Sequence, residues 1–174
     1  MAANFDPEQG DLLFMIVSAG GPTTGTVDRV RRELSRGQQV RVIATPQAAE
    51  WLDHDTIEQL TGWPLQWKML TPEASTLEPM GNRVLATPVT LNTLTKWADG
   101  HADNLAIGLL CEALGAGIEI RAELSLSQQF ANHPAVPAAL RRLNAARHVT
   151  FDSHPDAGLS MSEIEWAAGS LAGP

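Results

Sequence analysis

The chain of 174 residues has no tyrosine, a single cysteine and few other aromatic residues, and its basic residues are outnumbered by acidic ones. One cysteine, Cys111, excludes an internal disulfide framework and a zinc site built from several thiolates. With 12 Lys and Arg against 20 Asp and Glu, the formal net charge is −8, which disfavours general attraction to nucleic-acid phosphates. We therefore expect no nucleic-acid partner and a reducing, cytoplasmic environment.

A local basic patch is the remaining route to nucleic acid, and four arginines do cluster in one segment. They are Arg29, Arg31, Arg32 and Arg36. Charges gathered this closely on a predicted helix usually form its solvated face, and we predict that these four do so rather than bind phosphate.

Long hydrophobic runs are also missing. The run Leu12–Val17 is far shorter than the roughly 20 residues that cross a bilayer, and we expect no membrane partner and no targeting segment. The 44% hydrophobic content suits one globular domain, predicted over residues 11–155. Residues 1–10 are predicted to be a flexible amino terminus, and residues 156–174 a carboxyl-terminal helix and tail.

The first third of the chain predicts a strand, a helix and a second strand. Leu12–Val17 is a continuous apolar run bounded by small residues, which is typical of a strand buried on both faces. Val27, Val30 and Leu34 then recur at helical spacing before Gly37. Val40–Ala44 follows as the second strand, so this unit predicts a parallel crossover.

The alternation of strands and helices continues, apart from a segment with three prolines at Trp63–Met80. Helices are predicted near Ala48–Leu52, Thr56–Leu60, Leu91–Trp97, Asn104–Leu114 and Val136–Asn144, and strands at Arg83–Ala86, Ile118–Ala122 and His148–Phe151. This pattern predicts an α/β fold, a single Rossmann-like three-layer domain with a central parallel sheet.

Three predicted loops follow strands and are expected at one edge of that sheet, where open α/β sheets hold ligands. They are Ser18–Thr26, Thr45–Gln47 and Pro88–Thr93. The first offers glycines, threonine hydroxyls and the amides of a helix start, which suit an anion such as phosphate. It has neither the Walker nor the dinucleotide glycine spacing, and a turn with a helix cap is the alternative interpretation.

Four segments together resemble one family. They are Gly21-Pro22-Thr23 at the first loop, Thr45–Trp51 (similar to T-x-x-A-x-x-F), Pro88–Lys96 (similar to P-x-S-A-N-T-x-x-K) and Gly100–Leu105 (similar to G-x-x-D-N-L). The chain resembles, over roughly residues 12–145, the flavoprotein family of homo-oligomeric flavin-containing cysteine decarboxylases. This family includes phosphopantothenoylcysteine decarboxylases and peptidyl-cysteine decarboxylases.

The resemblance implies a flavodoxin-like doubly wound sheet, FMN as cofactor, assembly into trimers or dodecamers, and a peptide substrate that ends in cysteine. The residues implied to contact FMN are Gly21, Pro22, Thr23, Thr45, Gln47, Thr90, Leu91, Asn92, Thr93 and Ser125. Asn92 is implied to lie beside the flavin ring and substrate as the catalytic residue; its alternative role is to cap a helix. Asp103 also has two possible roles: the family motif, or an ordinary helix cap.

Three features of the family are missing. At the position where the family has its histidine, this chain has Ala74. A general base would therefore be Glu73, Glu78 or a histidine from another part of the chain. The family's substrate-binding asparagine corresponds to Ser127, and no cysteine follows Cys111.

The resulting hypothesis is FMN-dependent oxidative decarboxylation of a peptide's carboxyl-terminal cysteine to an enethiol, in ribosomal peptide natural-product biosynthesis. A catalytically idle flavin-binding or regulatory subunit is the first alternative. Phosphopantothenoylcysteine decarboxylase is the second, and it is disfavoured by all three absences.

Overall fold

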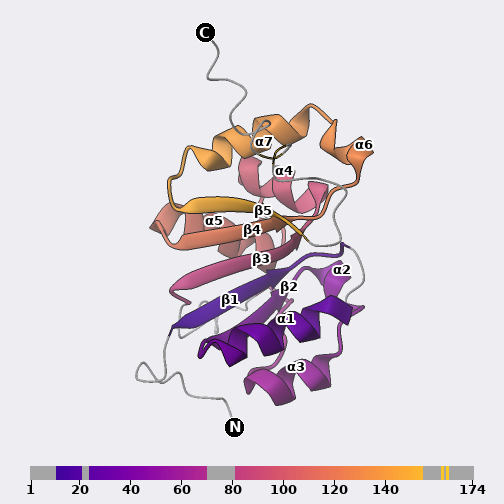
Figure 1. Cartoon of the computed structure of the whole chain (residues 1–174), viewed down its shortest axis with the longest axis vertical. Helices are drawn as coiled ribbons and strands as arrows, with labels where there is room; N and C mark the ends of the chain where they lie inside the picture. The colour runs from indigo at the N-terminus through magenta and orange to yellow at the C-terminus, as the bar shows by residue number, and fades with distance from the viewer. Residues whose placement is uncertain (1–10, 21–23, 70–80, 155–161, 163, 165–174) are drawn as a thin grey trace.

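The computed structural model describes residues 11–20, 24–69, 81–154, 162 and 164. These residues form a parallel, five-stranded sheet in the order β2-β1-β3-β4-β5. The strands are β1 (Leu12–Val17), β2 (Gln39–Ala44), β3 (Arg83–Val89), β4 (Glu119–Leu124) and β5 (Val149–Ser153). Their arrows run toward the right-hand side of Figure 1, so the carboxyl ends of the strands share one edge.

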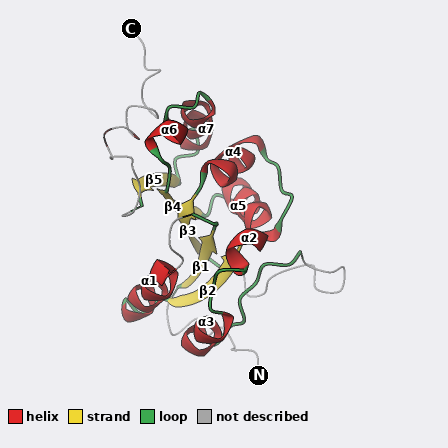
Figure 2. Cartoon of the chain, turned by 90° about the vertical axis from the view of Figure 1, so that its right-hand side faces the viewer, coloured by secondary structure: helices red, strands yellow, loops and turns green. Residues whose placement is uncertain are grey.

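Helices cover both faces of the sheet, as the predicted three-layer fold requires. They are α1 (Thr24–Ser35), α2 (Pro46–Ala49), α3 (His54–Thr61), α4 (Leu91–Asp99), α5 (Leu105–Ala116), α6 (Gln128–Ala131) and α7 (Ala135–Asn144). Figure 2 looks onto the carboxyl edge, with α1 on one side of the strands and α4 and α5 on the other. The fold is therefore α/β and Rossmann-like, with the strand order of flavodoxin-like sheets.

Strand β1 lies at the centre of the core because both of its faces are buried. Successive side chains of a strand point to opposite faces. Phe14 accordingly packs in the cluster that α4, α5 and α7 cover, while Met15 packs in the cluster beneath α1 and α3. This double burial explains why β1 reads as a continuous apolar run.

Strand β4 is apolar on one face only. Ile120 and Leu124 are buried in the cluster beneath α4, α5 and α7. Arg121 and Glu123 alternate with them and therefore point to the face that carries α1. This face of β4 is charged.

The strands and helices predicted within residues 11–155 are all present, with corrections at their ends. Strand β3 continues past the predicted end at Ala86 to Val89, and α2 spans Pro46–Ala49 instead of Ala48–Leu52. The four-residue helix α6 was not predicted, because so short a segment has no hydrophobic periodicity.

Two predicted regions fall largely outside the described residues. These are the amino terminus, residues 1–10, and most of the tail, residues 156–174; Ile164 of the tail is buried against the cluster beneath α7. Within the proline-containing segment, the Gln66 amide donates to the Val42 carbonyl at 3.1 Å and extends the edge beside β2. In the part of the chain that the structure describes, every helix is too short or too polar to span a membrane.

Trp97 joins α4 to α5, which predicts a large loss of stability on its removal. Its side chain is 1% exposed, and its indole N–H donates to the Leu110 carbonyl at 3.1 Å. We predict that Trp97→Ala lowers the free energy of unfolding by about 3 to 5 kcal/mol, measured by urea denaturation. Met69→Ala is the control, because Met69 is 60% exposed, and it should cost less than about 1 kcal/mol. Equal losses in the two variants would contradict the observed packing.

Candidate functional site

The loops after β1 and β3 leave the sheet in opposite directions. These strands are neighbours, yet the chain passes from β1 to α1 on one face and from β3 to α4 on the other. Open α/β sheets bind their ligands at the carboxyl edge where the connections reverse in this way. The candidate site therefore lies at the β1/β3 boundary.

Ser18 ties these two loops together. Its hydroxyl donates to the Pro88 carbonyl at 2.5 Å and accepts from the Thr90 amide at 3.2 Å. Its own amide donates to the same Pro88 carbonyl at 3.3 Å. Because Ser18 is 3% exposed, these bonds form in the interior. Ser18 was not among the predicted site residues; its position at the end of a buried strand was the available signal.

The other two loops lie beside this junction. The Thr45 amide, after β2, donates to the Val17 carbonyl at 2.9 Å. The Ser125 amide, after β4, donates to the Val89 carbonyl at the same distance. The predicted convergence of the loops after the first three strands is confirmed, and Ser125 joins them from β4.

Hydroxyl side chains begin three of the helices at this edge. The hydroxyls of Thr45, Thr90 and Ser127 cap α2, α4 and α6, accepting the amides of Ala48, Thr93 and Phe130. An accepting hydroxyl still has its own proton to donate. The first amides of a helix lack partners within it, so the start of the nine-residue helix α4 presents donors suited to an anion.

The predicted contact residues after β2 and β3 occupy different environments. Thr93 is buried, with its hydroxyl 3.3 Å from that of Thr90. Leu91 is half-buried, whereas Asn92 and Gln47 are exposed. Capping by Asn92 was the alternative role, and it is wrong because Thr90 caps α4. The remaining predicted contacts, Gly21, Pro22 and Thr23, lie outside the described residues.

The predicted cap at Asp103 is also wrong. Asn104 caps α5 instead, accepting the Ile107 amide at 3.2 Å. Asp103 accepts a hydrogen bond from Lys96, and this ammonium holds the pKa of the carboxyl below its usual value. Asp103 thus joins the end of α4 to the start of α5.

The predicted solvated arginine face holds for three of the four arginines. Arg31, Arg32 and Arg36 are exposed. Arg29 is an exception, since its side chain is 14% exposed and it contacts Glu33 at 2.8 Å and Glu123 at 2.7 Å. Sequence reasoning missed this because Glu123 lies far along the chain.

Each described histidine either forms a hydrogen bond or is exposed. His54 lies 2.7 Å from the Ala49 carbonyl, and His148 lies 3.1 Å from the Leu114 carbonyl. His133 accepts the Ala135 amide, and His101 is exposed. His154 follows β5, and its amide donates to the Leu124 carbonyl at 2.9 Å, which places it next to the Ser125 loop.

The expected general base is not visible among the described residues. Ala74, at the family's histidine position, and the candidates Glu73 and Glu78 lie outside them. Cys111 is half-buried in α5, and burial raises the pKa of its thiol, as expected for a packing residue. Across the described ranges, no cluster of His, Cys, Asp and Glu is suited to a metal ion.

Gly20 makes the close approach of the two loops possible. A Cβ built on it would lie 2.7 Å from the Thr90 Cγ2 methyl. We predict that Gly20→Ala lowers the free energy of unfolding by about 1 to 3 kcal/mol, measured by denaturant titration.

Two variants control for this prediction. Adding Thr90→Ser removes the clashing methyl but keeps the capping hydroxyl, so it should restore most of the loss. Gly25→Ala should be neutral or stabilising, because a Cβ there meets no atom within 4 Å and alanine favours helix. A Gly20→Ala protein as stable as wild type would contradict the close contact.

Comparisons with known proteins agree with this architecture. Among solved structures, the chain is similar to the cypemycin decarboxylase CypD, with 20% identity, a TM-score of 0.68 and 92% of each chain covered. It is similar to the FMN-dependent cysteine decarboxylase TvaF from thioviridamide biosynthesis, with 20% identity, a TM-score of 0.66, and 94% of this chain and 99% of TvaF covered.

A third similar structure is the epidermin biosynthesis protein EpiD from Staphylococcus aureus. Here the identity is 18%, the TM-score is 0.65, and 83% of this chain and 82% of EpiD are covered. At such identities these likenesses establish the fold alone. No curated protein sequence matches the chain. A sequence model of the family described as Flavoprotein matches residues 8–168. The chain therefore belongs to the Flavoprotein family.

Proposed function

We propose that this chain binds FMN at the β1/β3 boundary and uses it in the oxidative decarboxylation of a peptide's carboxyl-terminal cysteine to an enethiol. Membership of the Flavoprotein family and a fold shared with the decarboxylases CypD and TvaF support this proposal. The observation that carries it is the junction at Ser18, which holds the loops after β1 and β3 together at the expected ligand position. The biological setting proposed is ribosomal peptide biosynthesis.

The residues present fit a flavin phosphate. FMN carries a charge of about −2 on its phosphate, and the chain itself is at −8, so the attraction must be local. A helix amino terminus supplies about half a positive charge together with unpartnered N–H donors. The start of α4, with the Thr90 and Thr93 hydroxyls, provides these groups, and Gly20 leaves no side chain in the way.

The proposed reaction removes carbon dioxide and two hydrogens from the cysteine. FMN, when bound, supplies the acceptor for the two electrons. The chain's own task is to hold the thiol and Cβ against the ring, exclude water and stabilise developing negative charge. The exposed Asn92 carboxamide is the group assigned to this task, since the Thr90 hydroxyl and the first amides of α4 would hold the phosphate.

Several residues are candidates for the general base. Glu73 and Glu78 remain candidates from the sequence. His154, whose backbone amide bonds to Leu124 beside the Ser125 loop, is a further candidate at the same edge.

A flavin-binding subunit without decarboxylase activity is the second candidate function, and Ser127 favours it. At the position of the family's substrate-binding asparagine, the Ser127 hydroxyl accepts the Phe130 amide at 3.3 Å to cap α6. A hydroxyl there is shorter than a carboxamide and has one proton to donate where the amide has two. Phosphopantothenoylcysteine decarboxylase is disfavoured, since no cysteine follows Cys111.

We also propose that the protein is a homo-oligomer, a trimer or a dodecamer. Two large apolar side chains are exposed near the carboxyl edge, Trp51 after α2 and Phe130 in α6, at 51% and 54%. Large apolar side chains that are exposed on a monomer are available for contacts between subunits.

The proposed activity predicts a yellow complex and a defined product. Purified protein is titrated with FMN, and the complex is incubated with peptides that end in cysteine. We expect binding at micromolar FMN and a peptide mass loss of about 46 Da, carbon dioxide plus two hydrogens. FMN binding without consumption of any such peptide would favour the flavin-binding subunit, and no FMN binding would exclude both.

Asn92 is predicted to act on catalysis more than on folding. Because its side chain is exposed at the start of α4, Asn92→Ala should leave the thermal unfolding temperature within a few degrees of wild type. Turnover by the FMN complex should fall by about 100-fold or more, as for loss of a donor that stabilises a transition state. Asn144→Ala, at the exposed end of α7, is the matched control with unchanged turnover. Full turnover in Asn92→Ala would remove this residue from the proposal.

A further inference from the structure

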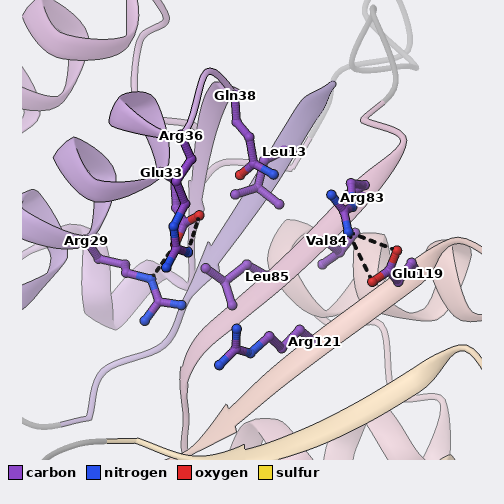
Figure 3. A pocket seen from close by; sticks show the side chains of 10 residues that line it. All are labelled: Leu13, Arg29, Glu33, Arg36, Gln38, Arg83, Val84, Leu85, Glu119 and Arg121. Carbon is purple, nitrogen blue, oxygen red and sulfur yellow. Dashed lines mark hydrogen bonds and ion pairs between the residues drawn. The ribbon is translucent and has the colours of Figure 1, made fainter. Parts of the chain in front are cut away.

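A row of ion pairs crosses the charged face of β4, below the carboxyl edge. A cavity of about 240 Å³ lies between α1 and strands β3 and β4. Figure 3 shows the side chains of both signs that line it. Arg29 and Glu33 reach it from α1, and Arg121 reaches from β4 toward Arg29. The proposed reaction uses none of these groups.

Glu123 is the centre of this row. Its side chain is 3% exposed, and both carboxylate oxygens are engaged by Arg29, at 2.7 and 3.0 Å. The Thr87 hydroxyl donates to the same carboxylate at 2.7 Å. Arg29 also donates to Glu33 at 2.8 Å. A charged pair buried this deeply needs these several hydrogen bonds, because water does not solvate it.

The row is electrically balanced, which decides against an anion-binding role for the cavity. Successive contacts join three arginines and three carboxylates in alternation, in the order Arg36, Glu33, Arg29, Glu123, Arg121 and Asp152. Arg83, which also lines the cavity, pairs with Glu119. An anion would have to displace these carboxylates, so the arrangement indicates a structural role.

The Arg29–Glu123 ion pair lies next to the loops of the candidate site. Thr87 immediately precedes Pro88, whose carbonyl bonds to Ser18. Glu123 lies two residues before Ser125, and Arg29 lies in the helix that follows the first loop. A single carboxylate therefore connects α1, β3 and β4 where all three approach the site.

We propose that the Arg29–Glu123 pair is a positioning element of the flavin site. It holds α1 in register with the carboxyl ends of β3 and β4, and so sets the spacing between the start of α1 and the Pro88–Thr93 loop. Buried ion pairs add little net stability but impose a particular geometry, and the planar arginine fork is suited to that. This inference rests on the proposed function in that FMN is the ligand being positioned.

The test compares two isosteric changes on the same face of β4. Glu123→Gln keeps the size of the side chain but removes its charge and replaces one of its two acceptor oxygens with an NH2 donor. Glu119→Gln is the matched control, because Glu119 is 63% exposed and pairs with Arg83 away from the loops. We expect Glu123→Gln to weaken FMN binding about tenfold in fluorescence titrations and to shift the bound flavin's absorption bands, with neither change in Glu119→Gln.

Two further variants separate positioning from folding. Arg29→Lys keeps the charge but loses the two-pronged contact, and should weaken FMN binding while the chain remains folded. Arg29→Gln combined with Glu123→Gln leaves neither charge unpaired. This double variant should unfold at a higher temperature than Glu123→Gln alone, yet still bind FMN weakly. If the double variant regained both its affinity for FMN and its thermal stability, the pair would have a purely structural role. That result would overturn the proposal.

The outcomes distinguish this inference from the proposed function. Wild-type protein that takes up no FMN sinks the proposed function, and with it this inference. Wild-type protein that binds FMN while folded Glu123→Gln and Arg29→Lys bind it equally well, with the same spectrum, overturns the inference alone. Amide hydrogen exchange of the ligand-free proteins gives an independent readout. Exchange at Ser125 and Thr90 should accelerate in Glu123→Gln and not in Glu119→Gln, and unchanged exchange in both counts against the proposal.

Discussion

The contact between the ends of β1 and β3 is the constraint on which the candidate site depends. Parallel strands that are neighbours in the sheet, but are followed by helices on opposite faces, leave their loops side by side at one edge. Ser18 joins those loops with hydrogen bonds to Pro88 and Thr90, and Gly20 allows an approach that a Cβ would obstruct. The helix that follows β3 then begins at a defined position, which is what a bound anion requires.

The charge of the protein shows why the local geometry matters. A chain with a net charge of −8 repels an anionic cofactor at long range, and salt screens that repulsion within about 10 Å. The helix starts at the carboxyl edge act at contact distance, where their amides and hydroxyls supply direct donors. Arg29 and Arg121 do not serve as the counter-charge, because both are paired with carboxylates.

Much of the fold and part of the site could be predicted from the sequence. The doubly buried strand β1 reads as an apolar run, the helical spacing of α1 is clear, and the loop motifs after β2 and β3 lie where the structure brings them together. The features that the sequence did not predict depend on three-dimensional information that a linear pattern lacks. The choice of Asn104 over Asp103 as a cap depends on backbone dihedrals, and the burial of Arg29 depends on Glu123, which is distant in the chain. Ser18 likewise acquires its role only through a strand 70 residues away.

The most direct test of the account is a crystal structure of the protein grown with FMN. The account predicts a flavin phosphate at the start of α4, in contact with the loop that follows β1, and an isoalloxazine ring within reach of the Asn92 carboxamide. A flavin bound elsewhere, such as in the cavity between α1 and β4, or an Asn92 side chain directed away from the ring, would contradict it.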